Sequence, residues 1–284
     1  MPGVLFEGGS FRPVFSCGVM DALLEQDVMF PYCIGVSAGA ADAASYVSKQ
    51  KGRNIRIFEK YRNDKRYIGK RNIWKERSVF GVQFVFRDIP NEIDPFDFKT
   101  FRQYDGRFLI TATDARTGKT RYLTQKDVDR SFEAFHATCA LPGIIPPAVI
   151  GGREYFDGGL SNPIPIDKLV SDGNDKALIV LTRPEGFRKE CRRSDRLVAK
   201  AVGHRYPVIA KQVCTRYKKY NQSVLCCEKM EKEGRAIIIR PKEPIHSYEK
   251  DVTKLRRTYE QGYQMAMARM DEIKELFLSG QTHE

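Results

Sequence analysis

The sequence predicts an α/β fold, and three observations lead to this prediction. Short apolar runs of strand length alternate with longer amphipathic segments along the whole chain. The 284 residues suffice for one large domain, and an apolar content of 42% is ordinary for a globular protein that buries a core. No repeat, low-complexity tract or convincing linker divides the chain, so we expect one domain over residues 1–284.

The individual elements follow from the length and periodicity of these runs. Apolar runs of four to seven residues predict strands at 3–7, 31–35, 107–113, 119–124, 177–182 and 236–240. Segments with apolar residues at helical spacing predict helices at 15–26, 38–50, 53–62, 129–139, 164–171, 205–232 and 250–278. The turn residues Thr117-Gly118-Lys119 separate two of the strands and predict a hairpin.

The charge of the chain is strongly basic, with a net value of +12, and it is unevenly distributed. Residues 183–257 hold 21 basic and nine acidic side chains, and residues 49–77 hold 12 basic and three acidic ones. Such clusters favour anionic partners, either a membrane surface, a phospholipid headgroup or a nucleic acid, although a well-solvated basic surface is the plainer interpretation. Because no nucleic-acid-binding motif is present, we expect no nucleic acid partner.

The cysteines, the histidines and the apolar runs indicate where in the cell the protein is located and whether it holds a structural metal. The longest apolar runs, such as residues 177–181, are too short to span a bilayer, and no basic-then-apolar leader precedes the first expected strand. The seven cysteines form no C-x-x-C pair and the four histidines are scattered, so we expect reduced thiols and no structural zinc. These observations predict a cytoplasmic protein, with peripheral contact to a membrane as an extension of that prediction.

A candidate nucleophile lies in the stretch Gly35-Val36-Ser37-Ala38-Gly39, which fits the pattern G-x-S-x-G. This pattern is typical of a nucleophile elbow, a sharp strand-to-helix turn that presents a serine hydroxyl. Here an apolar run precedes Ser37 and an alanine-rich helical segment follows it, as an elbow requires. Gly35 and Gly39 allow the tight turn, and the helix N-terminus favours developing negative charge.

The position of this elbow argues against an α/β-hydrolase with a histidine base. Only about thirty residues precede it, which is room for one strand and one helix, whereas in that fold several strands come first. Neither of the late histidines, His204 in Val202-Gly203-His204-Arg205 and His246 in Pro244-Ile245-His246-Ser247, lies in a strongly loop-like, glycine-flanked catalytic context.

Two further glycine-containing segments have residues suited to the same chemistry. The stretch Gly8-Gly9-Ser10-Phe11-Arg12 lies between a strand and a helix, so its consecutive N–H groups can bind an oxyanion or a phosphate, or it is a simple turn. The stretch Asp157-Gly158-Gly159 places an acid at a strand end. An ionised carboxylate there can accept the proton of a serine directly, although Asp-Gly-Gly alone is more often only a turn.

Together and in this order, the three segments resemble the patatin-like phospholipases, in particular their short bacterial branch. Residues 137–147 and 162–165 are similar to segments that flank the catalytic aspartate of that family, and residues 80–97 resemble the short bacterial branch. The resemblance extends over essentially the whole chain and is less diagnostic in the last hundred residues. It implies a three-layer α/β/α fold with a mostly parallel sheet, in which the more basic, helical residues 183–284 pack on the same domain. It implies neither a metal nor an organic cofactor.

The resemblance also assigns roles to residues of the three segments. It implies that Ser37 is the nucleophile and Asp157 the general base, with an oxyanion hole formed by the N–H groups of Gly9, Ser10 and Phe11. Arg12 matches a basic residue that supports this loop. Two departures stand out, because the loop of the family reads Gly-Gly-Gly-x-Arg-Gly and here Ser10 and Pro13 replace two of the glycines.

The function implied is hydrolysis of a carboxylic ester in a lipid through an acyl-serine intermediate, as in a phospholipase A or lipid acyl hydrolase. Two alternatives stay open: a weakened or inactive protein of this fold that binds anionic membranes, and an acyltransferase. The aromatic residues between 74 and 98 predict either an acyl channel, an interfacial flap or ordinary core packing. The basic stretch 49–77 follows the nucleophile helix, so we expect it near the entrance of the site.

Overall fold

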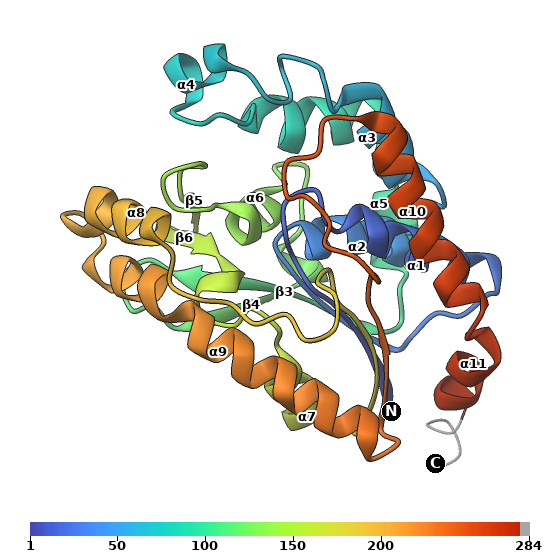
Figure 1. The fold of residues 1–284 in the computed structure, drawn as a ribbon. Coiled ribbons are helices and arrows are strands. Elements are labelled where there is room, and N and C mark those ends of the chain that lie inside the picture. Colours follow the sequence, from blue (N-terminus) through green and yellow to red (C-terminus); the bar gives the residue numbers. More distant parts are fainter. Residues whose placement is uncertain (279–284) are drawn as a thin grey trace.

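The computed structural model describes residues 1–278, and residues 279–284 at the end of the expected domain lie outside this part (Figure 1). The strands are β1 (Pro2–Phe6), β2 (Tyr32–Val36), β3 (Arg107–Asp114), β4 (Thr120–Thr124), β5 (Ala148–Ile150), β6 (Arg153–Asp157), β7 (Lys176–Val180) and β8 (Ala236–Ile239). The helices are α1 (Val14–Glu25), α2 (Ala38–Val47), α3 (Arg53–Tyr61), α4 (Lys70–Glu76), α5 (Phe98–Arg102), α6 (Glu133–Cys139), α7 (Ile166–Ser171), α8 (Arg193–Gly203), α9 (Pro207–Lys232), α10 (Val252–Met267) and α11 (Met270–Leu278). A π-helix, η1 (Phe84–Ile93), and two short 3-10 helices, η2 (Gln125–Asp127) and η3 (Gly158–Leu160), complete the set.

All eight strands join one sheet in the order β5-β6-β3-β2-β1-β7-β8, with β4 paired to β3 off this path. Strands β1, β2, β3, β7 and β8 pair in parallel, whereas β4, β5 and β6 run antiparallel to their neighbours. The expected mostly parallel sheet is therefore confirmed.

The register of β3 brings the ends of two distant strands together. One side of β3 is occupied by β4, and the other side pairs first with β2 and then with β6. Val36, at the end of β2, pairs with Thr111, and Asp157, at the end of β6, pairs with the next residue of β3, Ala112. The residue after β2 and the last residue of β6 consequently meet at one point of the sheet.

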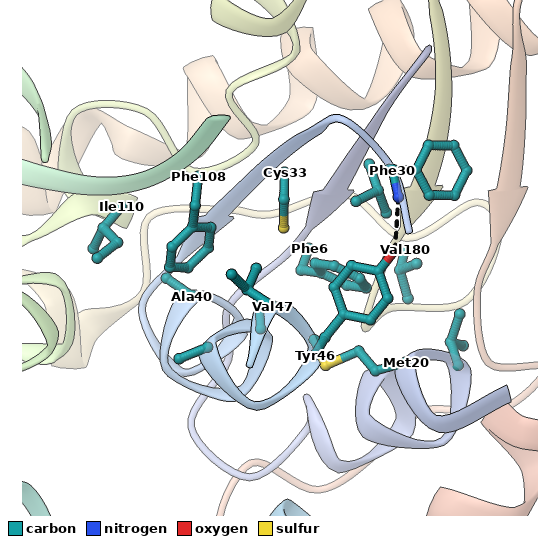
Figure 2. Packing of buried hydrophobic residues seen from close by; sticks show 14 of the residues in the cluster. Phe6, Met20, Phe30, Cys33, Ala40, Tyr46, Val47, Phe108, Ile110 and Val180 are labelled. Carbon is teal, nitrogen blue, oxygen red and sulfur yellow. Dashed lines mark hydrogen bonds between the residues drawn. The ribbon is translucent and has the colours of Figure 1, made fainter. Parts of the chain in front are cut away.

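Helices cover both faces of the sheet, which confirms the three-layer arrangement (Figure 1). On one face, strand residues such as Phe6, Cys33 and Val180 pack against α1, α2, α6 and α11. Figure 2 shows Tyr46 of α2 within this cluster, where its hydroxyl accepts the N–H of Phe30 at 2.9 Å. On the other face, alternate residues of the same strands pack against α7 and α9. The strands are buried on both sides, as their continuous apolar runs require.

The C-terminal helix α10 lies on α1, far from it in sequence (Figure 1). Two glycines make this close approach possible. A Cβ on Gly262 would lie 2.0 Å from the carbonyl oxygen of Phe15, and one on Gly18 would lie 1.9 Å from that of Tyr259. The C-terminal helices are therefore packed directly against the N-terminal part of the chain.

Several sequence-based boundaries were wrong. The expected helix 250–278 is broken into α10 and α11 at residues 268–269, because α10 packs on α1 while α11 turns to cover the sheet. The expected helix 129–139 begins only at Glu133, since Asp129 caps a preceding turn through the N–H of Ser131. Strand β5 and helices α4, η1, α5 and α8 were not predicted. Strand β5 and helices α4 and α5 are short, η1 contains Pro90, and α8 has no buried residue and lies in a strongly charged segment.

Candidate active site

Ser37 lies on the predicted sharp turn between β2 and α2. Its backbone has φ 55° and ψ −135°, a strained conformation for a residue with a side chain. A Cβ on Gly35 would lie 2.5 Å from the Cα of Ala40, and one on Gly39 would lie 2.4 Å from the carbonyl oxygen of Glu7. Both glycines of the pattern are thus required by close backbone contacts.

The hydroxyl of Ser37 donates to the Oδ2 of Asp157 at 2.6 Å. The other carboxylate oxygen, Oδ1, accepts the N–H of Gly159 at 2.7 Å, so both oxygens are held in place. Asp157 is buried, with an exposed fraction of 3%, and burial raises the pKa of its carboxyl above the usual value, whereas the bonds from Ser37 and Gly159 lower it. The geometry is that of a serine paired directly with a carboxylate, with no imidazole between them.

The loop that follows β1 lies beside this pair. Gly9 has φ 150° and Ser10 has φ 58°, so serine occupies a left-handed position there, which costs about 1 kcal/mol or more relative to glycine. Among residues 1–278, neither the Gly9 N–H nor the Ser10 N–H has an acceptor, which leaves both available. The N–H of Phe11, in contrast, donates to the carbonyl oxygen of Ser247 at 3.2 Å. The N–H of Phe11 is therefore already used by Ser247 in this structure, and its place in the oxyanion hole stays a prediction.

Arg12 holds the loop in position through hydroxyl groups. Its Nε donates to Thr182 at 3.2 Å and its Nη1 to the hydroxyl of Ser247 at 2.5 Å. Thr182 in turn donates to the carbonyl oxygen of Gly8 at 3.1 Å. The guanidinium of Arg12 also lies directly against Gly9, where an added Cβ would be 2.4 Å from its Nη2, and burial lowers the pKa of this guanidinium. Pro13, with φ −61°, begins the turn into α1 as expected.

Ser37 and Asp157 open into a cavity of about 510 Å³ that has both an apolar and a basic part. The apolar part comes from the 141–144 loop and from α8 and α9, with Leu141, Pro142, Ile144, Val198 and Val213. The basic part comes mainly from the segment that follows β7, with Arg183, Arg188, Lys189 and Arg192.

The residues that line this cavity bear on two predictions, one about the aromatic residues between 74 and 98 and one about the basic stretch 49–77. Phe84, Phe86 and Phe96 are buried in the core, so core packing describes these aromatics better than an acyl channel. Trp74, on α4, is 91% exposed and contributes to neither. None of the basic residues 49–77 lines the cavity, whose cations come from residues 183–216 and Arg12. The local charge of 49–77 gave no information on where the segment would lie.

Three positioning residues were not found from the sequence. Thr138 accepts the N–H of Ser37 at 2.7 Å and donates to the carbonyl of Thr111 at 2.6 Å, which fixes the elbow. Thr182 and Ser247 hold Arg12 as described above. Thr138 lies within the resembling stretch 137–147, but no feature of the sequence places its hydroxyl against the elbow.

Other features of the described chain bear on cofactors and on the membrane. Within residues 1–278, no group of three or more His, Cys, Asp or Glu side chains could hold a metal ion. The same residues include no helix with the length and apolarity needed to cross a membrane. All seven cysteines are free thiols. Independence from cofactors and a cytoplasmic location stay predictions.

The chain belongs to the patatin-like phospholipase family, whose model matches residues 4–170, more than half of its length. A second model, a domain of unknown function (DUF6363), matches residues 206–278.

Individual proteins are also similar to this chain. The uncharacterized protein YjjU of Escherichia coli (strain K12) is 22% identical over 184 residues, which is 63% of this chain and 51% of YjjU. The matching part thus spans about half the length of that relative. Among solved structures, VipD from Legionella pneumophila has 11% sequence identity and a TM-score of 0.49, over 95% of this chain and 67% of that one.

Proposed function

We propose that the protein hydrolyses carboxylic esters of lipids with a Ser37–Asp157 dyad. The observation that carries the proposal is the 2.6 Å hydrogen bond from the Ser37 hydroxyl to the buried carboxylate of Asp157, at the floor of a cavity. A nucleophile and a base within hydrogen-bond distance satisfy the geometric requirement for an activated serine.

In the first half of the reaction, the Ser37 oxygen attacks the carbonyl carbon of the ester and Asp157 takes the hydroxyl proton. The tetrahedral oxyanion accepts hydrogen bonds from the N–H groups of Gly9 and Ser10, which have no other acceptor among the described residues. The bond to the leaving alcohol then breaks and Asp157 returns the proton to its oxygen. An acyl-serine ester stays on the enzyme.

In the second half, a water molecule attacks the acyl-serine carbonyl while Asp157 takes one of its protons. The same two N–H groups hold the second oxyanion. Collapse releases the fatty acid, and the Ser37 oxygen recovers its proton from Asp157. Burial raises the pKa of the Asp157 carboxyl, so its carboxylate is a stronger proton acceptor than that of an ordinary aspartate.

The test is covalent labelling with a fluorophosphonate serine-hydrolase probe, read by intact-mass analysis. We expect a single adduct on the wild type, none on Ser37→Ala, and much slower labelling of Asp157→Asn. Ser161→Ala is a matched control, because Ser161 is a buried serine near the site that bonds Thr113 and not the base. Labelling of Ser37→Ala at the wild-type rate would refute the assignment.

The two alternatives to hydrolysis have distinct readouts. An acyltransferase passes the acyl group to an added alcohol acceptor, so its products contain a new ester in place of the free fatty acid. An inactive membrane-binding protein binds anionic vesicles in a salt-sensitive way and does not react with the probe. The strained left-handed Ser10 and the used N–H of Phe11 are the observations that favour weakened activity.

Peripheral contact with an anionic membrane is part of the same proposal. Two exposed apolar side chains, Trp74 on α4 at 91% and Leu197 on α8 at 69%, stand among exposed lysines and arginines. Helix α8 borders the 141–144 loop of the cavity, because Val198 packs with Ile144 in one cluster. The segment after α4 reaches the same loop, because the N–H of Val79 donates to the carbonyl of Ile144. An apolar tip with a basic rim suits the interface of an anionic bilayer.

We also propose that residues 206–278 form one folding unit with residues 4–170. The two matched regions share the sheet, because β8 pairs with β7 and α10 packs on α1. They also share the site, because Ser247 holds both Arg12 and Phe11. A separate domain would have its own core and few such contacts.

A further inference from the structure

The basic part of the cavity contains cations that no carboxylate neutralises directly. The Nε of Arg183 is buried and has no acceptor within the described residues, and its guanidinium lies 4.5 Å from the ring centre of Phe187. The Nζ of Lys189 lies 3.7 Å from the ring centre of Tyr220. Neither head group forms an ion pair in the part of the chain that the structure describes. Aromatic faces stabilise the two cations only partly.

Two further arginines of the cavity form ion pairs. Arg188 pairs with Glu228 at 2.8 Å, outside the cavity lining, and Arg216 pairs with Asp195 at 3.0 Å. Arg12 donates to hydroxyl groups, as described above. Arg183, Lys189 and Arg192 therefore line the cavity without an ion pair among the described residues, and the first two are the ones held against aromatic rings.

One buried acid, Glu7, opposes these cations from the end of β1. Its exposed fraction is 2%, and its carboxylate accepts the N–H of Thr182 at 2.7 Å. Burial lowers the pKa of Lys189 to about 7, and the charge of Glu7 acts against this shift. The guanidiniums of Arg216, Arg12 and Arg183 lower it further. Four carboxylates line the cavity, those of Glu7, Asp157, Glu190 and Asp195, against six lysine and arginine side chains. The cations are in excess, and a bound anion would lessen the remaining repulsion.

The topology places these cations next to the nucleophile. Strand β1 lies between β2 and β7, so the segments that follow β2 and β7 leave the sheet on either side of the β1 loop. Ser37 follows β2, Arg183 follows β7, and both line the same cavity. Parallel sheets bind ligands in the crevice at such a point, beyond the carboxyl ends of the strands.

We infer that Arg183 and Lys189 bind a phosphate group of the substrate, so that the ester cleaved at Ser37 belongs to an anionic, phosphate-bearing lipid. A guanidinium binds two phosphate oxygens side by side, and an ammonium adds a point charge. The apolar part of the cavity, with Leu141, Ile144 and Val198, accommodates an acyl chain. The inference rests on the proposed hydrolase function, and it adds the class of headgroup.

The experiment compares two soluble esters with the same short acyl chain, a 1-acylglycerol 3-phosphate and the corresponding 1-acylglycerol, both below the concentration at which they aggregate. The readout is the ratio of kcat/KM for the phosphate ester to kcat/KM for the neutral ester. We expect Arg183→Gln and Lys189→Met each to lower this ratio about tenfold, the size of one lost charge-assisted contact. Arg183→Lys keeps the charge and should retain part of the preference.

Arg257→Gln is the matched control, because Arg257 is an exposed arginine of α10 outside the cavity. Its ratio should equal that of the wild type. A wild-type ratio near one, or a ratio that Arg183→Gln and Lys189→Met leave unchanged, overturns the inference while hydrolysis itself stands.

Binding to Ser37→Ala, measured by calorimetry, separates failure of the inference from failure of the proposed function. If the wild type cleaves neither ester and Ser37→Ala still binds the acylglycerol phosphate in a manner that Arg183→Gln abolishes, the subsite stands and the hydrolase assignment fails. Inorganic phosphate is the second probe. Should inorganic phosphate bind as tightly as the acylglycerol phosphate, the site takes free phosphate and the headgroup inference is overturned.

The acylglycerol phosphate should bind more weakly as pH rises above about 7, because Lys189 then loses its proton. Lys189→Met should remove this pH dependence of binding.

Discussion

Residues 4–170 and residues 183–278 build the same site in different ways. The first region supplies the groups assigned to the reaction, namely Ser37, Asp157 and the Gly9–Ser10 donors, and it does so at turns where backbone atoms touch. The second region supplies no such group, but it provides the cations of the cavity, part of the apolar wall and the residue that holds Arg12.

The difference between these regions shows which features of a site can be recognised from the sequence. A close backbone contact requires glycine, and a glycine pattern is visible in one dimension. A cavity wall requires only side chains of suitable size and charge, which many residues satisfy. The groups assigned to the reaction could therefore be found from motifs, whereas the cavity walls could not.

The largest expected effect tests the chemical role of the first region. Asp157→Asn removes the proton acceptor of Ser37, so we expect kcat for ester hydrolysis to fall about 10³-fold. The measurement is steady-state hydrolysis of a soluble ester. Asp167→Asn is the control, because Asp167 is an exposed acid of α7 away from the cavity. Near-normal turnover of Asp157→Asn would remove Asp157 from the mechanism.

The same variant has an opposite effect on stability. Burial raises the pKa of Asp157 in the folded protein above its unfolded value, so the group contributes stability at low pH that is lost as pH rises through the folded pKa. Asp157→Asn should therefore be more stable than the wild type near pH 7, and this gain should disappear below about pH 4. Urea unfolding across this pH range measures it. A gain that does not vary with pH would contradict the burial argument.

A substitution at the contact of α10 with α1 tests whether the two regions unfold together. Gly262→Ala places a methyl group about where the carbonyl of Phe15 lies, so we expect a loss of about 1–3 kcal/mol in the free energy of unfolding. Gln264→Ala, on the exposed side of the same helix, should cost much less. One shifted transition supports a single unit, whereas a second transition that shifts alone would show that residues 206–278 unfold separately.

A smaller effect tests whether Ser247 of the second region supports the loop of the first region that carries Gly9 and Ser10. Ser247→Ala removes the hydroxyl that accepts from Arg12, so the loop carrying Gly9 and Ser10 loses part of its support. We expect kcat to fall about tenfold, the effect of one lost hydrogen bond to a charged group. Ser171→Ala removes a hydroxyl that bonds only within its own helix and should leave kcat unchanged. Equal kcat values for the two variants would separate Ser247 from the site.

The smallest effect concerns the surface that faces a lipid. Trp74→Ala and Leu197→Ala should each weaken binding to anionic vesicles about three- to tenfold, because each removes an exposed apolar side chain from a basic surface. Leu225→Ala, which removes an exposed apolar residue of α9, should have no effect. If Trp74→Ala alone weakens binding, contact with the membrane belongs to the first region only.

Most of the sheet and the central helices could be predicted from the sequence. Strands such as β1 and β7 are continuous apolar runs that are buried on both sides, and their observed limits lie within one or two residues of those expected. The short elements α4, α5 and β5 were missed, because they have too few residues for a periodic signal. The break between α10 and α11 was missed for another reason: one apolar period is compatible with a single helix or with two that pack on different partners.

The sequence by itself determined the α/β class, the elbow at Ser37, the acid at the end of β6 and the family to which the chain belongs. These depend on local requirements, namely strand hydrophobicity and glycine at backbone contacts. The tertiary structure decided which groups meet. The pairing of β2 and β6 on one side of β3 brings Asp157 to Ser37, and the docking of the 241–248 segment uses the N–H of Phe11. The structure also decided that the cavity takes its cations from the segment after β7 and none from 49–77, because the position of a charged segment depends on long-range packing and not on its own composition.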